Sequence, residues 1–404
     1  MTTIAFAWRY LWSRPLAAAL NLLLLSLGLA SMTFLLLVSH QIDKAFERDL
    51  AGIDVVVGAK GSPMQLILSG VFHLDVPTGN VPLAAVKELE AHPQVASVIP
   101  VSLGDSFRGF RIVGTRPAYI DNYAAVLAQG ALWSAPMQAV IGAQVARQTG
   151  LKVGDSFAGS HGLASAGSPG GEVHAATPYQ VTGVLAPTGG VLDRLMLTSL
   201  DSVWQVHEAD TALDDEDRRI LQEEREVTLA LIKYKTPLAA VTFPRFINTT
   251  TEMQSAAPAV EITRLLSMVG VGIDVLRALA GVLLLTAGLS VFIALWSAVR
   301  ERRADLALLR MLGAPPRKIA GLLLCEALWL ALLAALLGLL LGQGLLALMA
   351  WMLQLQNSVL IGGMSWPAEL MVVPVLALVV ALASALLPAW EAYRISVFEL
   401  LQSR

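Results

Sequence analysis

The residues best suited to chemistry in this 404-residue chain are six histidines, one cysteine and one carboxylate inside a long apolar run. None of them falls in a known catalytic pattern. The chain has no G-x-x-x-x-G-K-[ST] sequence to hold the phosphates of ATP, and no H-E-x-x-H or G-x-S-x-G pattern of a metallopeptidase or serine hydrolase. We therefore expect no catalytic residue and no enzyme activity in this chain.

The histidines raise the question of a metal. Imidazole and carboxylate groups suit Zn²⁺, and Glu172 lies beside one of the two histidines that flank a Gly/Ser/Ala-rich stretch at 159–171. Their spacing matches no diagnostic zinc motif, so we expect no metal site, and a region that handles a metal stays open as the alternative. The histidines are His40, His73, His92, His161, His174 and His207.

Glu326 is a charge inside an apolar run that extends from residue 319 to about residue 345. In a membrane span such a charge marks a functional site or an internal partner. At ~1.5 Å of helix rise per residue, Glu326 would lie roughly 10 Å into the membrane. We expect a structural ion pair with a basic residue near the inner face, or a capping role, with a proton relay as the alternative.

A short charged segment, 300–318, separates this run from the apolar run before it. Its charges could contact another protein, and its leucines recur at helical spacing and form an apolar face. We expect it to receive force from a separate ATPase; the alternative is a basic loop that only anchors the chain. The residues concerned are Arg302, Arg303, Asp305, Leu306, Leu309, Arg310, Leu312, Gly313 and Arg317.

The composition indicates a membrane protein. Hydrophobic residues make up 55% of the chain and charged residues 15%, against roughly 25% charged in an average soluble domain. Mean hydropathy is +0.64. The net charge of −3 gives no basic field for nucleic acid, and a single cysteine, Cys325, excludes an intramolecular disulfide framework.

Four apolar runs reach the roughly 20 residues that a helix needs to span a bilayer. They are 16–38, 278–299, 319–345 and 370–387, and the third continues as an apolar pattern to residue 353. The first run is too long for the apolar region of a signal peptide, so we expect an uncleaved anchor. We interpret the excess length of the third run as tilt or as an extension beyond the membrane.

Basic residues in the short loops orient these runs. Arg9 and Arg14 precede the first run, six Lys or Arg residues occupy 300–318, and Arg394 and Arg404 follow the last run. The segment 354–369 between the third and fourth runs has no Lys or Arg. Both termini and the 300–318 segment are therefore expected in the cytoplasm, and the region between the first two runs outside it.

That outer region has ordinary charge and mixed patterning, which predicts an α+β domain. Strands are expected at 54–58, 95–101, 110–114 and 179–185, and helices at 82–92 and within 140–151, where Gly150 would cap the helix. A strongly charged segment at 210–226 is expected to be a solvated helix. Apolar residues at helical spacing in 261–276 lead into the second span, so helices are expected to support the domain.

Four stretches resemble the MacB/FtsX/LolC-type permeases of ABC transporters, the type VII superfamily. Residues 296–342 are similar to the FtsX-like permease domain, and 388–401 resemble its ending, except that Ser396 stands where the family usually has proline. Residues 140–157 and 179–204 resemble the MacB-like periplasmic core domain, whereas 54–82 does not match the best-known members. The matching positions of 296–342 are Arg300, Glu301, Arg302, Leu308, Arg310, Leu312, Gly313, Ala314, Arg317, Ile319, Glu326, Gly338 and Gly342.

The resemblance implies a fold and a set of partners. It implies four transmembrane α-helices with a large α+β extracytoplasmic domain inserted between helices 1 and 2. Residues 1–39 would hold a cytoplasmic N-terminal helix and the first span, 40–275 the periplasmic domain with its stalk, and 276–404 the permease domain with spans two to four, the coupling segment 300–318 and a cytoplasmic tail. A separate MacB/LolD-like ABC ATPase would bind ATP and Mg²⁺, and no cofactor would bind this chain.

The resemblance also implies a function. The chain would be an inner-membrane permease subunit that couples ATP hydrolysis to movement of its periplasmic domain, acting by mechanotransmission on lipid, lipoprotein or other hydrophobic cargo. Its partners would be a second permease copy, identical or related, membrane lipid, and a periplasmic protein or lipoprotein. Two alternatives stay open: a component of a zinc-related envelope transport system, and an FtsX-like regulator of a cell-wall hydrolase.

Overall fold

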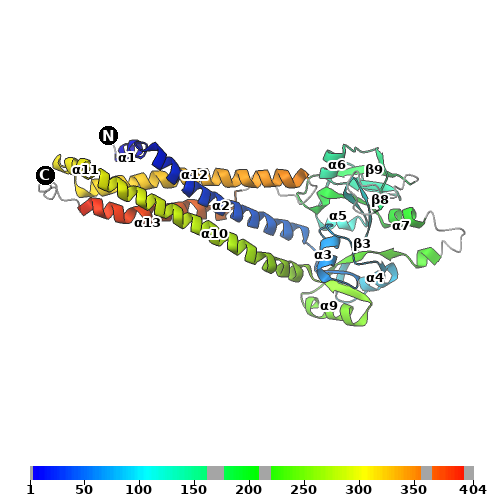
Figure 1. Ribbon diagram of the computed structural model, residues 1–404. Helices are drawn as coiled ribbons and strands as arrows, with labels where there is room; N and C mark the ends of the chain where they lie inside the picture. Colours follow the sequence, from blue (N-terminus) through cyan, green and yellow to red (C-terminus); the bar gives the residue numbers. More distant parts are fainter. Residues whose placement is uncertain (1–2, 162–176, 209–219, 356–365, 395–404) are drawn as a thin grey trace. The chain divides into compact units, whose positions relative to one another are not determined.

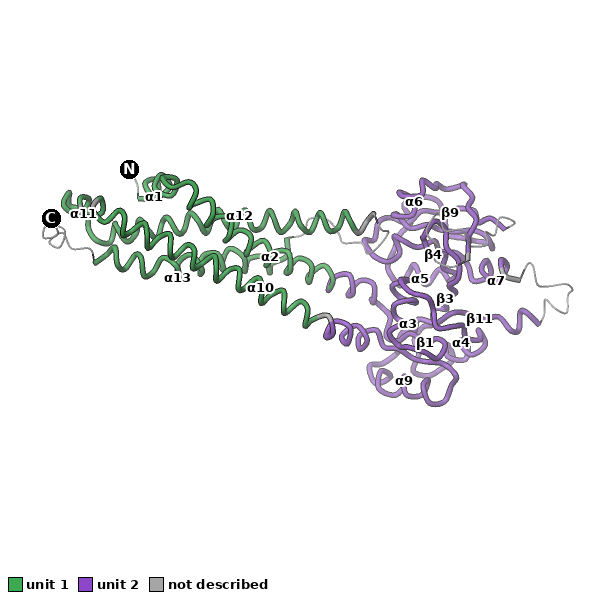
Figure 2. Tube along the Cα trace, viewed as in Figure 1, with its two compact units in different colours: residues 1–42, 269–404 green, residues 43–268 purple. Residues whose placement is uncertain are grey.

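The computed structural model describes residues 3–161, 177–208, 220–355 and 366–394. The chain divides into two compact units, one formed by residues 1–42 and 269–404 and the other by residues 43–268 (Figure 2). Where the structure describes it, the first unit is helical. The second unit holds the β-sheet.

Four helices of the described chain are long and apolar enough to cross a membrane, which confirms the four predicted spans. Helix α12 continues past residue 345, as the apolar pattern predicted. The four are α2 (Pro15–Asp49), α10 (Pro258–Glu301), α12 (Pro316–Leu355) and α13 (Val372–Arg394), with α1 (Thr3–Leu11), α11 (Arg303–Met311) and the 3₁₀ turn η2 (Ala368–Met371) between or before them (Figure 1).

Helices α2 and α12 approach closely where α12 lacks side chains. A Cβ atom added to Gly338 would lie 2.6 Å from the Cβ of Leu29, and one added to Gly342 would lie 2.5 Å from the Cβ of Thr33. Small residues at a helix crossing let the backbones come into van der Waals contact, which favours association in lipid. At Gly344 nothing lies within 4 Å of the added atom, so only the first two glycines serve this crossing.

Polar side chains inside the bundle bind neighbouring helices. The hydroxyl of Ser384 on α13 donates to the carbonyl of Gly288 on α10 at 2.8 Å, and the hydroxyl of Ser290 donates to the side-chain oxygen of Asn21 on α2 at 2.7 Å. A polar group facing hydrocarbon would have no such partner. These bonds therefore fix which faces of α2, α10 and α13 pack together.

The second unit is built on one sheet that contains eleven strands in the described residues. Its order is β13-β1-β12-β3-β4-β10-β6-β9-β5, with β7 paired to β9 and β8 to β3. The strands are β1 (Val55–Ala59), β3 (Val95–Phe107), β4 (Phe110–Thr115), β5 (Leu127–Gly130), β6 (Gln138–Ile141), β7 (Ser156–Phe157), β8 (Ser160–His161), β9 (Tyr179–Leu185), β10 (Leu195–Ser199), β12 (Leu229–Tyr234) and β13 (Met253–Ala256), while β2 (Val81–Pro82) and β11 (Glu226–Val227) pair separately.

Strand β3 joins the two halves of this sheet. Its first half pairs antiparallel with β12 and its second half pairs antiparallel with β4. Beyond β4 the sheet is mixed, because β4–β10 and β6–β9 are parallel pairs. The strands expected at 54–58, 95–101, 110–114 and 179–185 are all present as β1, β3, β4 and β9.

Helices cover both faces of the sheet. Alternate residues of a strand point to opposite faces, and in β1 Val56 belongs to one buried cluster while Val55 and Val57 belong to another. The expected helices at 82–92 and within 140–151 are α4 and α6, and Gly150 ends α6 with φ +77°. The helices of this unit are α3 (Pro63–Gly70), α4 (Leu83–Glu90), α5 (Ala118–Asn122), α6 (Ala143–Thr149), the 3₁₀ turn η1 (Val191–Arg194), α7 (Leu200–Glu208) and α9 (Ala239–Thr250).

The last turn of α2, which belongs to the second unit, is hydrogen-bonded to the rest of that unit. The carboxylate of Asp49 accepts a bond from the backbone N–H of Val191 at 3.1 Å, and the hydroxyl of Tyr123 donates to the backbone carbonyl of Asp49, also at 3.1 Å. A Cβ atom on Gly190 would lie 2.6 Å from that carboxylate. Glycine is therefore needed for the loop to reach the helix.

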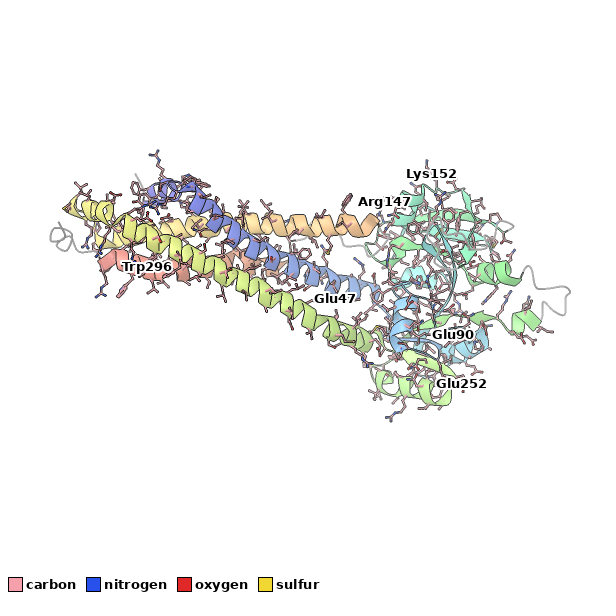
Figure 3. All side chains as sticks on the ribbon, viewed as in Figure 1. Glu47, Glu90, Arg147, Lys152, Glu252 and Trp296 are labelled. Atoms are coloured by element: carbon pink, nitrogen blue, oxygen red, sulfur yellow. The ribbon has the colours of Figure 1, made fainter. Side chains whose placement is uncertain are left out.

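Other charged side chains lie on the surface of the domain. Arg147, Lys152 and Glu252 are exposed on the domain, whereas Trp296 on α10 is half-buried (Figure 3). The guanidinium of Arg300 lies 5.8 Å from the ring centre of Trp296. Aromatic and basic side chains of this kind are typical of the end of a membrane span.

Candidate coupling site

The segment 300–318 contains a short helix, α11 (Arg303–Met311), with a break in the helix at each end. Residue Arg302, with φ −99° and ψ 14°, separates α10 from α11. At the other end Gly313 has φ +95°, its N–H binds the carbonyl of Arg310, and the N–H of Ala314 binds the carbonyl of Leu309, both at 3.0 Å. This is the Schellman arrangement, which favours glycine at that position, so α11 ends at a defined residue.

The inward face of α11 packs on the helical bundle. Leu306 is only 2% exposed and lies in the bundle core, and Leu309 packs against the same core. Of the three leucines predicted to offer an apolar face for another protein, only Leu312 is exposed, at 85%. The other two fix the position of α11.

The outward apolar face combines Leu312 with two residues that the sequence analysis did not select as contacts. Leu308 is 51% exposed and Met311 is 53% exposed, and both lie beside Leu312 at i, i+3 and i+4 spacing. Sequence reasoning missed Leu308 and Met311 as contact residues. The same spacing rule would have found them, because two sets of apolar residues at helical spacing overlap in this segment.

The charged residues of this segment also differ in exposure and direction. Arg303, Asp305 and Arg317 are exposed and Arg310 is half-buried. Arg302 instead turns toward the N-terminal helix, where its guanidinium carbon lies 3.7 Å from the ring centre of Tyr10. Its Nη2 donates to the hydroxyl of Ser13 at 2.6 Å, so Arg302 links the start of α11 to α1 and to the turn that follows α1.

Helix α1 packs against α12, and the turn that follows α1 contacts the end of α10. The rings of Trp8 and Trp329 meet edge to face at 4.8 Å, and Arg14 forms an ion pair with Glu301. The indole N–H of Trp329 points to the carbonyl of Ile4 at 3.4 Å. These contacts fasten α1 to the same end of the bundle as α11.

Glu326 lies on α12, is 7% exposed, and lines a cavity of about 30 Å³. Arg302 and Arg14 line the same cavity and act electrostatically on its carboxylate. Tyr10 and Asn21 also line it. The structure thus brings two of the predicted site residues, Glu326 and Arg302, to one place.

A second hollow adjoins α11. It has a volume of about 230 Å³ and is mostly apolar, with one cation. It opens where α1, α11 and the first turns of α12 meet. Its lining residues are Thr3, Phe6, Leu309, Ala314, Lys318, Ile319 and Leu322.

The histidines of the described chain form no cluster that could hold a metal. No group of three or more His, Cys, Asp or Glu side chains converges within the described ranges. His73 is buried and its Nε2 lies 2.9 Å from the hydroxyl of Tyr119. His174 and the side chain of His161 lie outside the described residues, as does most of the charged segment 210–226.

Family comparisons match both units. The FtsX-like permease C-terminal family matches residues 277–397, and the MacB-like periplasmic core domain family matches residues 18–241, more than half of the chain. The chain is a permease of the MacB/FtsX type. The α11 segment of this permease lies within the FtsX-like part. A comparison with curated proteins finds no match.

Three solved structures are similar to about half of this permease. The periplasmic region of MacB from Actinobacillus actinomycetemcomitans is 12% identical, covers 54% of this chain and 95% of its own, and has a TM-score of 0.34. The extracellular domain of the ABC-type transporter YknZ from Gram-positive bacteria is 11% identical, with coverages of 50% and 98% and a TM-score of 0.30. A domain of a permease protein from Porphyromonas gingivalis is 14% identical, with coverages of 52% and 88% and a TM-score of 0.27.

Proposed function

We propose that this permease couples ATP hydrolysis by a separate MacB/LolD-like ATPase to movement of its periplasmic domain. The observation that carries the proposal is the outward face of α11. Leu308, Met311 and Leu312 are exposed between the charged residues Arg303 and Arg317. An apolar centre with a charged rim is the usual anatomy of a protein interface.

The packing of α11 supports a role in passing on force. Its inward leucines lie in the core that also contains residues of α10, α12 and α13. A displacement of α11 must therefore shift the packed helices, because close-packed interiors transmit strain. ATP and Mg²⁺ would bind the partner ATPase, and this chain would bind no cofactor.

The loop charges support an orientation in which both termini and α11 are cytoplasmic and the sheet domain is periplasmic. In this orientation the ATPase meets α11 from the cytoplasm. A second permease copy, identical or related, completes the assembly. The cargo class is lipid, lipoprotein or another hydrophobic envelope component, handled by mechanotransmission through the domain.

The test is a pull-down of the detergent-solubilised permease followed by mass spectrometry. Leu312→Asp introduces a charge into the outward face of α11, and Leu238→Asp is the matched control, since Leu238 is a 70% exposed leucine in the sheet domain. We expect a Walker A ATPase to be retained by wild type and Leu238→Asp, and not by Leu312→Asp. If wild type retains no ATPase in any nucleotide state, the coupling role is wrong.

The same pull-down separates the alternative functions. Recovered lipid or lipoprotein supports transport, and a co-purified cell-wall hydrolase supports an FtsX-like regulator.

A zinc-related role needs histidines that can bind the metal. His73 is poorly placed to bind zinc, because its ring is buried and hydrogen-bonded to Tyr119. Replacing His73, His161 and His174 and finding unchanged envelope zinc would argue against that role.

A further inference from the structure

The cavity beside Glu326 contains polar atoms that the surrounding protein leaves without partners. In the described part of the chain, Oε2 of Glu326 and Nη1 of Arg302 are both buried and have no hydrogen-bond partner. Buried polar atoms are nearly always hydrogen-bonded to protein or to ordered water. A carboxylate that is more than nine-tenths buried is especially costly to leave unpaired.

The size and lining of the cavity identify the missing partner. At about 30 Å³ it is too small for a lipid or a metabolite, whereas a single water needs about 10–15 Å³. Five residues with polar side chains, Tyr10, Arg14, Asn21, Arg302 and Glu326, are among those that line it. This meets the requirement that a buried water have two to four polar partners.

We propose that one or two ordered waters occupy this cavity and join the carboxylate of Glu326 to the guanidinium of Arg302. Glu326 is then a positioning residue, since it acts on α11 through Arg302. Arg302 is the residue between α10 and α11, and its other contacts are Tyr10 and Ser13 on the N-terminal side. The waters thus link the guanidinium of Arg302 to α12 as well.

The consequence for coupling rests on the proposed function, in which α11 is the segment that meets the ATPase. Helices α11 and α12 are linked in sequence through Gly313, and the water-bridged pair adds a second link at the opposite end of α11. With both ends held, α11 cannot swing about Gly313 alone. A force on α11 is then transmitted to α12 at the position of Glu326.

Hydrogen–deuterium exchange of the full chain in nanodiscs, without any ATPase, tests the link. Glu326→Leu removes the acceptor, and we expect backbone amides of 303–311 to exchange about tenfold faster. Glu326→Gln keeps an oxygen for water but not the charge, and should give about a threefold rise. In an Arg302→Gln background, Glu326→Leu should add less than threefold, because the shared link is already lost.

The matched control is Gln343→Leu, which removes another buried polar side chain from the same helix, far from α11. It should leave exchange of 303–311 unchanged. Wild-type exchange in Glu326→Leu, or fully additive effects with Arg302→Gln, would overturn the proposal. The exchange experiment contains no ATPase, so its failure would count against the water-bridged link alone. Failure of the pull-down would count against the proposed coupling role.

Hydroxyl-radical footprinting tests the water itself. Leu330 lines the cavity and is only 3% exposed, so its oxidation in the wild-type chain requires an internal water. Ala298→Leu fills the cavity without changing a charged group, and should lower the labelling of Leu330 about fivefold and speed exchange of 303–311. Unlabelled Leu330 in wild type would show a dry cavity and overturn the proposal.

Discussion

At the scale of single residues, the helical bundle depends on positions that lack a side chain. The contacts of Gly338 and Gly342 with α2 leave no room for a Cβ atom, whereas Gly344 faces open space. All three glycines lie in one helix, α12. Their different roles follow from which face of α12 meets α2, and sequence alone did not show that.

Replacing Gly342 by leucine should destabilise the bundle by about 1–3 kcal/mol, because an overpacked contact forces the helices apart. The measurement is the thermal unfolding midpoint of the full chain in detergent. Gly344→Leu is the control, with an expected gain of about 0.5–1 kcal/mol from the higher helix propensity of leucine. Equal losses in both variants would show that α2 does not approach α12 at Gly342.

His73 gives a pH-dependent prediction. Burial, with the nearby guanidinium groups of Arg111 and Arg194, holds the pKa of His73 well below its ordinary value of about 6.5. As the pH falls through about 6.5, the unfolded chain therefore takes up a proton that the folded chain refuses. The free energy of unfolding should fall as the pH is lowered from about 8 to about 5.

The variant that tests this is His73→Asn, since asparagine tolerates the φ of +55° at this position. Its unfolding midpoint should depend less steeply on pH than that of wild type. Tyr119→Phe removes the hydrogen bond to His73 and keeps the imidazole, so it should lower stability by about 1–3 kcal/mol and retain the slope. An identical slope in His73→Asn and wild type would contradict the assignment.

At the same scale, the sequence predicted only part of the coupling site. Its charges and its position between two spans indicated the segment, but not which leucines face out. Leu306 and Leu309 pack inward, and the outward face uses Leu308 and Met311. The position of Arg302 over Tyr10 could not be predicted either, because it depends on how α1 folds back on the bundle. Whether these residues bind an ATPase stays a prediction.

At the scale of elements, the long apolar helices and the strongly patterned strands were predictable, and the short strands were not. Strand β9 alternates buried and less buried residues, which is a clear period-two signal. Strand β5, with the sequence LAQG, has no such signal and exists because it pairs with β9. The parallel pair β4–β10 joins segments about 80 residues apart, which local patterning does not reveal.

The end of α11 allows a matched test of glycine at two positions. Gly313→Ala places a Cβ on a residue with φ +95° and should cost about 1–2 kcal/mol. Gly321→Ala lies within α12, where nothing is within 4 Å of the added atom, and should stabilise the chain by about 0.5–1 kcal/mol. Unfolding midpoints that shift in the same direction would show that α11 does not end in a left-handed turn.

At the scale of the whole molecule, composition and charge predicted the membrane class, the four spans and the inserted α+β domain. The sequence did not show that β3 joins both halves of one sheet. Nor did it show the hydrogen bond between Asp49 and Val191 within the second unit. Both features depend on residues far apart in the chain.

Orientation can be measured with single cysteines in a Cys325→Ala background. Leu312→Cys and Leu238→Cys both replace exposed leucines, at 85% and 70% exposure. A membrane-impermeant maleimide added to intact spheroplasts should label Leu238→Cys, and should label Leu312→Cys only after lysis. The opposite pattern would place the sheet domain in the cytoplasm and reverse the topology.

The two edge strands of the sheet affect how closely copies of this protein can lie in an envelope without aggregating. An open sheet edge invites a strand from another molecule, which leads to fibrous aggregation. Strand β5 shifts its pairing with β9 between Leu127 and Gln129 and ends at Gly130 with φ +79°, and β13 at the other edge has only four residues. Neither edge strand is long and flat enough to pair readily with a strand of another molecule. Neighbouring copies can therefore lie close together without forming a shared sheet.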